Sequence, residues 1–544
     1  MHSVLVTMRH LPLSMKLPLA NSKVVRIAKE KVKHLHVFLS MRLGSIAKCA
    51  NYFFRRFYMF FQSNPLLLQL IYFMSTSFAG FLALKNLKPQ HKPTPRNLDL
   101  IFTSVSTLTV SSMATVEMED FSDQQLWVLI LQMLLGGEIF TSMLGLLFNN
   151  ARANTDNILQ KRLPSTCRDI DFSDAVNRSY QNNIGDIHSE ATVSHNQVSE
   201  SKGVNQYFCS ILAYVVAGYF VAGIVCSSLV VIIYIWTDSD AKYLLKSKNI
   251  KIWTFSIFTA VSSFANCGFT PINDNMAIFR KNSGLLLLVI PQILAGNTLF
   301  APLLRLSIWA LGKISKREEY AYILQHPEET GYRHLQRQKN AVNLVLTAVG
   351  IILLQVMFLC YFGWDSKPFE GLNWFQKLVC SLFQSVNTRH AGEAVIDISI
   401  LSPPILVLFA LVMYFPSDNS SDDQISTDKR ENSNSRPLWK NFNISQPAWL
   451  AAFIIFACIT ERRSMSLDPL NFNIFSIVFE VVSAYGNVGY SLGYSCERLL
   501  KPDADCKAVS YGFVGRWTDE GKLIIILVMI LGRLKKFSLK GGEP

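Results

Sequence analysis

The stretch Val261-Ser-Ser-Phe-Ala-Asn-Cys-Gly268-Phe269-Thr-Pro271 holds a glycine in a short, moderately apolar segment between two long apolar runs. A close copy occurs at Ser483–Ser491, and looser copies occur at Ser106–Met113 and Val386–Glu393. Each copy lies between a preceding and a following hydrophobic stretch. The pattern predicts an all-α membrane protein in which four repeats of helix, re-entrant loop and helix, with eight transmembrane helices in total, surround one central pore.

The composition also favours a membrane protein over a single soluble domain. Half of the 544 residues are hydrophobic and 17% are charged, which suits apolar spans separated by charged linkers. The net charge of +13 is concentrated outside the apolar runs, and residues 1–62 hold eleven Lys or Arg but only one acid, Glu30. Because a basic segment beside a span marks the cytoplasmic side, we expect no nucleic-acid partner.

The apolar runs and the polar segments between them divide the chain. The predicted parts are a basic cytoplasmic N-terminus (1–62), repeat A (63–150), a flexible cytoplasmic linker (151–203), repeat B (204–312), a cytoplasmic linker (313–339), repeat C (340–416), a cytoplasmic linker (417–445), and repeat D with the C-terminus (446–544). The N-terminus and the 313–339 linker carry the basic excess, and four spans separate them. Both chain termini are therefore predicted to be cytoplasmic.

The second spans of the repeats differ in regularity. Leu126–Phe148 and Gly284–Leu311 are predicted as single spans, whereas Ser402-Pro403-Pro404 interrupts the run Ile398–Phe415. Prolines in that position are expected to break or kink the helix. Two interpretations remain open, a flexible gate under the filter and a simple kink.

The repeated glycine has a physical use at membrane depth. Non-helical backbone survives there only where it is buried in protein or lines a watery cavity. Four such loops on one axis can replace the water shell of an ion with carbonyl oxygens, and glycine accepts the backbone angles that this requires. The alternative is that each glycine merely ends a short helix, but four copies flanked by spans favour an ion filter.

One quadrant of the predicted filter departs from the others. Aligning Leu108–Met113 with Phe264–Phe269 places a serine opposite a glycine, and a register shifted by one residue still places a serine there. The added Cβ and hydroxyl narrow that quadrant, which is expected to penalise potassium more than sodium. The predicted filter residues are Ser112, Gly268, Gly392 and Gly489, with Val110, Ser111, Asn266, Cys267, Ala391, Asn487 and Val488 beside them and His390 as loop scaffolding.

Charged residues outside the loops give further candidates. Arg533 lies in the last apolar run, eleven residues after Lys522, which is roughly 16 Å at helical rise. It is predicted to act as an electrostatic barrier in the pore, or else to begin a cytoplasmic basic cluster. The acids that follow the loops either concentrate cations at the outer mouth or form a solvated face; they are Glu117, Glu119, Asp120, Asp274 and Glu393. Glu138 is expected to be paired or to face the interior.

Cys496 and Cys506 lie in a polar stretch that this topology places outside the cell. A disulfide between them and two free thiols both fit the sequence.

Several motifs resemble those of the plant HKT family of sodium and potassium transporters, which is related to the microbial Trk and Ktr proteins. The resemblance covers about residues 60–540, and the chain is similar above all to the grass members of the family. The resemblance rests on the segments Thr109–Glu119, Ser263–Phe269, Pro291–Leu299, Asn387–Glu393, Ser483–Tyr490 and Tyr511–Trp517. It implies the same four filter positions, and serine at the first usually accompanies sodium selectivity. It also implies a homodimer.

The expected function is passive, sodium-preferring transport across the plasma membrane. Coupled sodium–potassium symport and mixed sodium–potassium uniport are the alternatives that the sequence leaves open. We expect no enzymatic activity, because the spans hold no paired acid–base, nucleophilic or metal constellation. No cofactor is expected beyond the transported Na⁺ or K⁺, which would bind to backbone carbonyls.

Overall fold

The computed structural model describes residues 65–90, 94–148, 191–364, 366–414, 446–499, 506, 508 and 512–538. The predicted N-terminal segment 1–62 and the linker 417–445 lie outside these residues. Nearly all of the described residues belong to one compact unit, which begins at Gln69. Its regular structure is helical throughout the described part, as predicted, and no strand occurs there.

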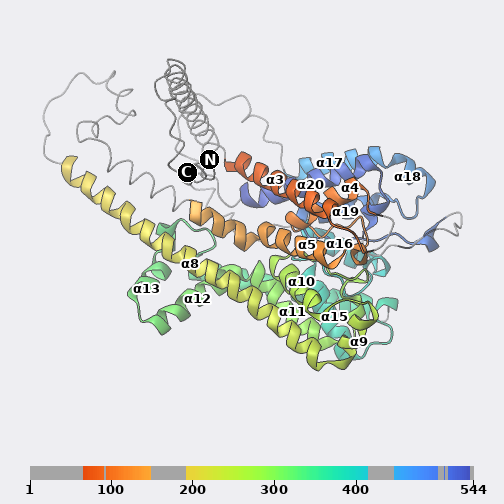
Figure 1. The fold of residues 1–544 in the computed structure, drawn as a ribbon, viewed down its shortest axis with the longest axis horizontal. Helices are drawn as coiled ribbons and strands as arrows, with labels where there is room; N and C mark the ends of the chain where they lie inside the picture. Colours follow the sequence, from red (N-terminus) through yellow and green to blue (C-terminus); the bar gives the residue numbers. More distant parts are fainter. Residues whose placement is uncertain are drawn as a thin grey trace, which may run out of the picture. The chain divides into compact units, whose positions relative to one another are not determined.

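Four similar groups of helices follow one another along the chain (Figure 1). Each group has a first helix, a short helix, a loop and a second helix. The first helices are α3 (Pro65–Asn86), α8 (Ala191–Thr237), α14 (Gln338–Gly363) and α17 (Gln446–Thr460). The short helices are α4 (Asn97–Leu108), α10 (Ile252–Ala265), α15 (Trp374–Asn387) and α19 (Ile474–Gly486). The second helices are α5 (Asp123–Gly136) with 138–148, α11 (Ser283–Gly296) with α12 (Phe300–Ser315), α16 (Pro403–Tyr414) and α20 (Asp519–Ser538).

The short helices fail to cross a membrane for a simple geometric reason. They contain 12 to 14 residues, so they are about 20 Å long, whereas the hydrocarbon core is about 30 Å thick. Local signals fix the starts of two of them: Asn373 and Gln376 form a capping box on α15, and the Asn473 side chain accepts a hydrogen bond from the backbone N–H of Ser476 on α19. Such caps satisfy N–H groups that a helix start leaves unpaired.

The groups pack in a closed cycle. Each short helix contacts the second helix of the preceding group: α10 contacts α5, α15 contacts α11, α19 contacts α16, and α4 contacts α20. The last contact joins the final group to the first. The cycle therefore brings all four loops that follow the short helices toward one another.

Two predicted spans prove to be bent. Leu126–Phe148 is divided into α5 and 138–148 with an angle of 55° between them, and Gly284–Leu311 is divided into α11 and α12 with an angle of 86°. The break after α5 falls at Gly137, whose extended backbone (φ −58°, ψ 147°) ends the helix. The average hydropathy stays high across both breaks although Glu138, Asn297 and Thr298 lie at them, so average hydropathy alone did not reveal them. By length and composition, three described helices can cross a membrane, or five if each bent pair is one span.

Close packing at glycines accounts for where the second helices cross the short ones. A Cβ on Gly136 would lie 1.9 Å from the carbonyl oxygen of Leu108, and one on Gly296 would lie 1.9 Å from that of Phe264. A Cβ on Gly532 would lie 2.2 Å from the carbonyl oxygen of Tyr485. Each of these carbonyls belongs to the last residues of a short helix, so three groups share one crossing geometry.

The prolines of repeat C do not form a gate under the loops. Pro403 and Pro404 begin α16 instead of interrupting a helix, and proline is tolerated in the first turn because its missing N–H would be unpaired there. The loop residue Arg389 contacts the carbonyl of Val412, near the opposite end of α16. The expected break in the run Ile398–Phe415 is confirmed, because η7 (Ile398–Ile400) ends before α16 begins at Pro403. The expectations of a kink within one helix and of a gate under the filter at this place are wrong.

Parts of the predicted linkers are folded. Helix α8 begins at Ala191, inside the segment expected to be flexible. The linker 313–339 contains α13 (Glu318–Gln325) and η5 (Pro327–Thr330). Within it Ile323, Tyr332 and Leu335 are buried in an apolar cluster together with residues of α8 and α12. This segment is charged on average, but its few apolar side chains are enough to dock it.

Candidate ion-selectivity filter

The four predicted loop positions lie together. A Cβ built on Gly268 would lie 1.4 Å from the carbonyl oxygen of Ala391, and one on Gly392 would lie 2.1 Å from that of Val488. A Cβ on Gly489 would lie 1.7 Å from the hydroxyl oxygen of Ser112. Around the loops, the residue of repeat B therefore lies next to that of repeat C, that of C next to that of D, and that of D next to that of A. We call Ser112, Gly268, Gly392 and Gly489 the candidate ring.

The thiol of Cys267 lies 3.9 Å from the carbonyl oxygen of Thr107, which brings the loop of repeat B against repeat A. Contacts thus link all four repeats around the ring.

Ser112 reaches across the candidate ring. Its hydroxyl donates to the carbonyl oxygens of Val488 (3.2 Å) and Ala391 (3.4 Å). These two carbonyls belong to different repeats and point toward the side chain that the sequence predicted to narrow the ring. The serine of repeat A thus touches repeats C and D directly.

The loop backbone is held in conformations that favour glycine. The φ angles are +91° at Gly268, +69° at Gly392 and +97° at Gly489, and they are also positive at Val110 (+50°) and Ser112 (+43°). Positive φ is costly for a β-branched residue such as valine, and strained backbone of this kind gathers at functional sites. The surrounding packing must therefore impose the loop shape in repeat A.

Repeats B and D share one scaffold behind the ring. The Asn266 amide donates to the carbonyl of Ile293 (3.2 Å), and the Asn487 amide donates to that of Met529 (2.9 Å). Both acceptors lie three residues before the crossing glycines of their second helices, Gly296 and Gly532. Both asparagines are left-handed (φ 58° and 50°), which asparagine tolerates better than most residues.

A second pair of hydrogen bonds repeats the likeness between these two repeats. The backbone N–H groups of Gly268 and Gly489 donate to the hydroxyls of Ser262 and Ser483, each six residues earlier.

His390 occupies the corresponding place in repeat C. One ring nitrogen lies 2.6 Å from the hydroxyl of Thr298, at the break between α11 and α12, and the other lies 2.6 Å from the carbonyl oxygen of Val386. The side chain is buried. The imidazole therefore braces the loop against the preceding repeat, in keeping with a scaffolding role.

Arg533 lies in the interior of the helix cycle. It is 2% exposed, and its guanidinium donates to the carbonyl of Gly136 at the end of α5. The break at Gly137 frees this carbonyl from the helix, and a cation is favourable at a helix C-terminus. Glu138, which is half-buried, directly follows Gly137, so both predicted intramembrane charges lie at the same break.

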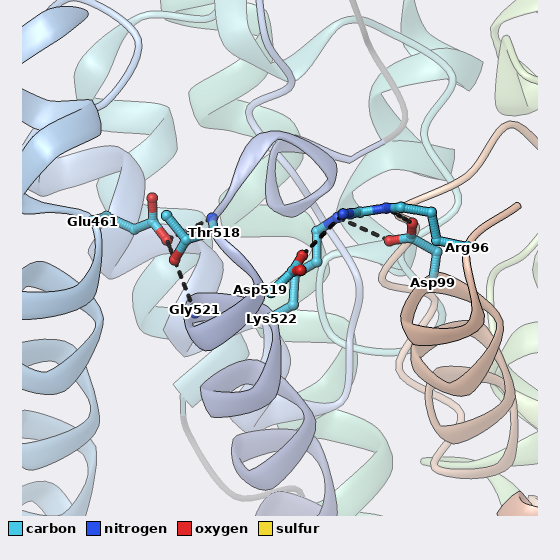
Figure 2. A network of polar contacts seen from close by, with 7 residues as sticks. All are labelled: Arg96, Asp99, Glu461, Thr518, Asp519, Gly521 and Lys522. Atoms are coloured by element: carbon cyan, nitrogen blue, oxygen red, sulfur yellow. Dashed lines mark hydrogen bonds and ion pairs between the residues drawn. The ribbon is translucent and has the colours of Figure 1, made fainter.

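An ion pair that the sequence did not suggest closes the cycle between repeats D and A. Lys522 and Asp99 form a buried pair at 2.8 Å, and Arg96 pairs with both Asp99 and Asp519 (Figure 2). These residues begin α4 and α20. The partners are 423 residues apart, so no local pattern reveals them.

Figure 2 also shows Glu461, which accepts hydrogen bonds from the backbone N–H and the hydroxyl of Thr518. This carboxylate joins the end of α17 to the start of α20.

The acids after the loops have different surroundings. Glu119 and Asp274 both pair with Lys248, at 3.0 and 3.1 Å. Burial lowers the pKa of Lys248, but its hydrogen bonds to these acids outweigh that effect and raise the pKa above its usual value. Glu393 is fully buried, so the expectation that it forms part of a solvated face is wrong, whereas its attraction for cations stays a prediction.

The structure joins Cys496 and Cys506 by a disulfide. The bond lies in the segment that connects the loop of repeat D to α20.

Comparisons with known proteins agree with the motifs. A family model described as cation transport protein, TrkH, matches residues 192–421 and 443–540. Cation transporter HKT1;1 of Oryza sativa subsp. japonica is 62% identical over 546 residues and 99% of each chain is covered. Cation transporter HKT1;3 of the same plant is 48% identical, with 95% of this chain and 98% of the relative covered. Sodium transporter HKT1 of Arabidopsis thaliana is 42% identical, with 85% and 91% covered.

The predicted family is thereby confirmed. The relatives are transporters and not enzymes, and the apolar helices agree with a multi-pass membrane protein. The chain belongs to the HKT family of cation transporters, within the Trk/Ktr/HKT superfamily.

Proposed function

We propose that this protein is a sodium-selective transporter that moves Na⁺ across the plasma membrane, down its electrochemical gradient, through the candidate ring. The observation that carries the proposal is the Ser112 hydroxyl, which bonds to the carbonyl oxygens of Val488 and Ala391. A cation that binds those carbonyls must displace the hydroxyl, and the serine Cβ leaves less room for the larger potassium ion. The relative from Arabidopsis is named a sodium transporter, which supports the same ion.

The driving force needs no chemical step. One elementary charge that crosses a potential of 100 mV gains about 2.3 kcal/mol. Carbonyl oxygens that replace the water shell let the ion enter the protein. The transported Na⁺ is thus the only small partner that the proposal needs, and no cofactor enters it.

The topology that we propose counts each bent pair as one span. Eight spans then result: α3, α5 with 138–148, α8, α11 with α12, α14, α16, α17 and α20. Both termini lie in the cytoplasm, repeat B begins earlier than predicted because α8 starts at Ala191, and the apolar side chains on the outer helices face lipid. The assembly is a homodimer, in which each chain holds its own complete ring.

In this proposal Arg533 also acts as an electrostatic barrier beside the ion path. Its positive charge lies close to the loops, because a Cβ on the preceding residue Gly532 would lie only 3.2 Å from the side-chain oxygen of Asn487. A fixed positive charge near an ion path slows the passage of cations. Its bond to Gly136 would hold this charge in place.

Mixed sodium and potassium transport is the second candidate. The rice relative that is 62% identical is named a cation transporter, without restriction to sodium. In addition, the feature that narrows the ring is a side chain, and a serine hydroxyl can rotate away from the ring.

Reversal potentials separate these candidates. In cells that express the chain, replacement of external Na⁺ by K⁺ should shift the reversal potential strongly for the wild type. We expect Ser112→Gly to reduce that shift by about half or more, because it removes the only Cβ among the ring residues.

Ser111→Gly is the matched control, because it tests the alternative register one residue earlier. If Ser111→Gly changes selectivity and Ser112→Gly does not, the register is wrong. If neither variant changes selectivity, the serine does not lie in the filter.

A further inference from the structure

Glu393 breaks a pattern that the other repeats follow. The residue directly after each ring position is Met113, Phe269, Glu393 or Tyr490. Tyr490 reaches back to the preceding repeat, where its hydroxyl donates to the carbonyl of Gln384 on α15 (2.8 Å). Glu393 also reaches back, and its Oε1 accepts from the hydroxyl of Ser263 on α10 (2.6 Å). A carboxyl group thus stands where the other repeats use large apolar or aromatic side chains.

Among the residues that the structure describes, the Glu393 carboxyl group has no ion-pair partner. Its side chain is 0% exposed, and its Oε2 has no hydrogen-bond partner within the described part of the chain. None of the ion pairs among the described residues includes Glu393. The buried acid Asp99, in contrast, pairs with Lys522.

Glu480 is the nearest comparison. It is also buried and has one oxygen without a partner among the described residues, but its other oxygen accepts from two donors, the Ser491 hydroxyl and the Leu492 N–H. It lies nine residues before Gly489, within α19. Glu393, by comparison, is covalently next to Gly392 and has a single donor.

An ionised carboxyl group that is buried without a cation is strongly unfavourable. It either binds a proton or acquires a positive partner. The described donor to its carboxyl group is the Ser263 hydroxyl, which carries no charge. If the proposed filter is correct, the transported ion brings a positive charge close to Gly392, and none of the ion pairs in the described part of the chain gives Glu393 another one.

We propose that Glu393 is a further determinant of cation binding, and that its carboxylate is the fixed negative charge whose counter-ion is the cation held in the ring. This inference rests on the proposed filter function. The two residues then have different roles. Ser112 sets the preference among ions by size, whereas Glu393 raises the affinity for monovalent cations in general.

Glu393→Gln tests the charge without removing the contact, because the glutamine carbonyl can still accept from the Ser263 hydroxyl. The measurement is the Na⁺ current as a function of external Na⁺, in cells where the surface amount of each variant is determined. We expect the half-saturating Na⁺ concentration to rise at least fivefold, while the maximal current per molecule stays within twofold and the Na⁺-to-K⁺ preference is unchanged. Glu393→Asp keeps the charge and should stay within threefold of the wild-type half-saturation.

Glu461→Gln is the matched control, since it neutralises another fully buried acid that lies away from the ring. It should leave the half-saturating concentration within twofold. A wild-type half-saturation in Glu393→Gln would overturn the proposal, and so would an equal loss of affinity in Glu393→Asp. If Glu393→Gln does not reach the surface, the half-saturating Na⁺ concentration of Glu393→Asp is the test, and a rise of more than threefold would overturn the proposal.

The failure of this inference is distinguishable from failure of the filter. If Ser112→Gly alters selectivity while Glu393→Gln leaves affinity unchanged, only the role of Glu393 is refuted. If Ser112→Gly has no effect either, the filter itself is refuted.

Discussion

Repeats B and D build their quadrants of the ring alike, whereas repeats A and C depart from them. B and D both use a left-handed asparagine, Asn266 or Asn487, that anchors the loop to its own second helix. Repeat A has Val110 in that place, and repeat C has His390. Repeats B and D share the asparagine scaffold. Ser112 in repeat A and Glu393 in repeat C differ from the residues at the same positions in B and D, and these two are proposed to act in ion choice or binding. Substitutions in each kind of quadrant can test this division.

The largest effect is expected from Gly268→Ala in the scaffold quadrant. The added Cβ would lie 1.4 Å from the carbonyl oxygen of Ala391, far inside the 3.0 Å that real contacts keep, and φ is +91°. The backbone of a neighbouring repeat must then move. We expect the Na⁺ current per surface molecule to fall at least about tenfold, since close-packed interiors transmit such strain.

Gly331→Ala is the control for this substitution. Gly331 also has a positive φ, +61°, but a Cβ there would meet nothing within 4 Å. It should cost only about 1–2 kcal/mol of backbone strain and leave the current nearly unchanged. Wild-type current in Gly268→Ala would mean that the loops leave more room at the ring than these distances allow.

The sequence reveals the alike quadrants best. Gly268 and Gly489 are found because asparagine, serine and an aromatic residue recur around both. The cycle of four repeats follows from them, since each copy lies between two apolar runs. Gly392 and Ser112 are found only by their place in this cycle, and the motifs that resemble the HKT family give the same assignment.

The remaining features depend on long-range packing. The bends at Gly137 and at 297–299 are marked only by short polar insertions, Glu138 and Asn297-Thr298, which do not record the direction of the helix that follows. The sequence does not predict the burial of Glu393 either, since an acid after a glycine is typical of an exposed loop. The Lys522–Asp99 pair joins the two ends of the cycle, which no window of sequence contains.

The next largest effect is expected from a difference between the asparagines of repeats B and D. The Asn487 amide also donates to the hydroxyl of Ser111 in repeat A (2.8 Å), whereas the described contact of the Asn266 amide stays within repeat B. Glycine in either place keeps the left-handed backbone but removes the amide. Because each buried partner left unsatisfied costs about 1–3 kcal/mol, Asn487→Gly should lower the melting temperature of the purified protein more than Asn266→Gly does.

Asn487→Gly should in addition alter the Na⁺-to-K⁺ preference, because it frees the residue next to Ser112. Asn266→Gly serves as its control. An equal loss of stability in both, with no change in preference, would show that the link between repeats D and A has no bearing on the ring.

The smallest effect is expected when repeat A is given the scaffold of B and D by Val110→Asn. By the spacing in those repeats, the new amide would face the carbonyl of Met133, three residues before Gly136. The change loses a buried valine side chain, which costs about 1.5–3 kcal/mol. It relieves the left-handed strain of about 1–2 kcal/mol and adds a hydrogen bond of about 1 kcal/mol. These terms nearly cancel, so the melting temperature should change little, and the reversal potential should stay that of the wild type because Ser112 is retained. A loss of more than about 3 kcal/mol in the free energy of unfolding would exceed the cost of the lost valine burial alone. It would mean that repeat A holds its loop by apolar packing and that an asparagine at position 110 finds no hydrogen-bond acceptor. The difference between the quadrants would then extend to the residues that hold the loops.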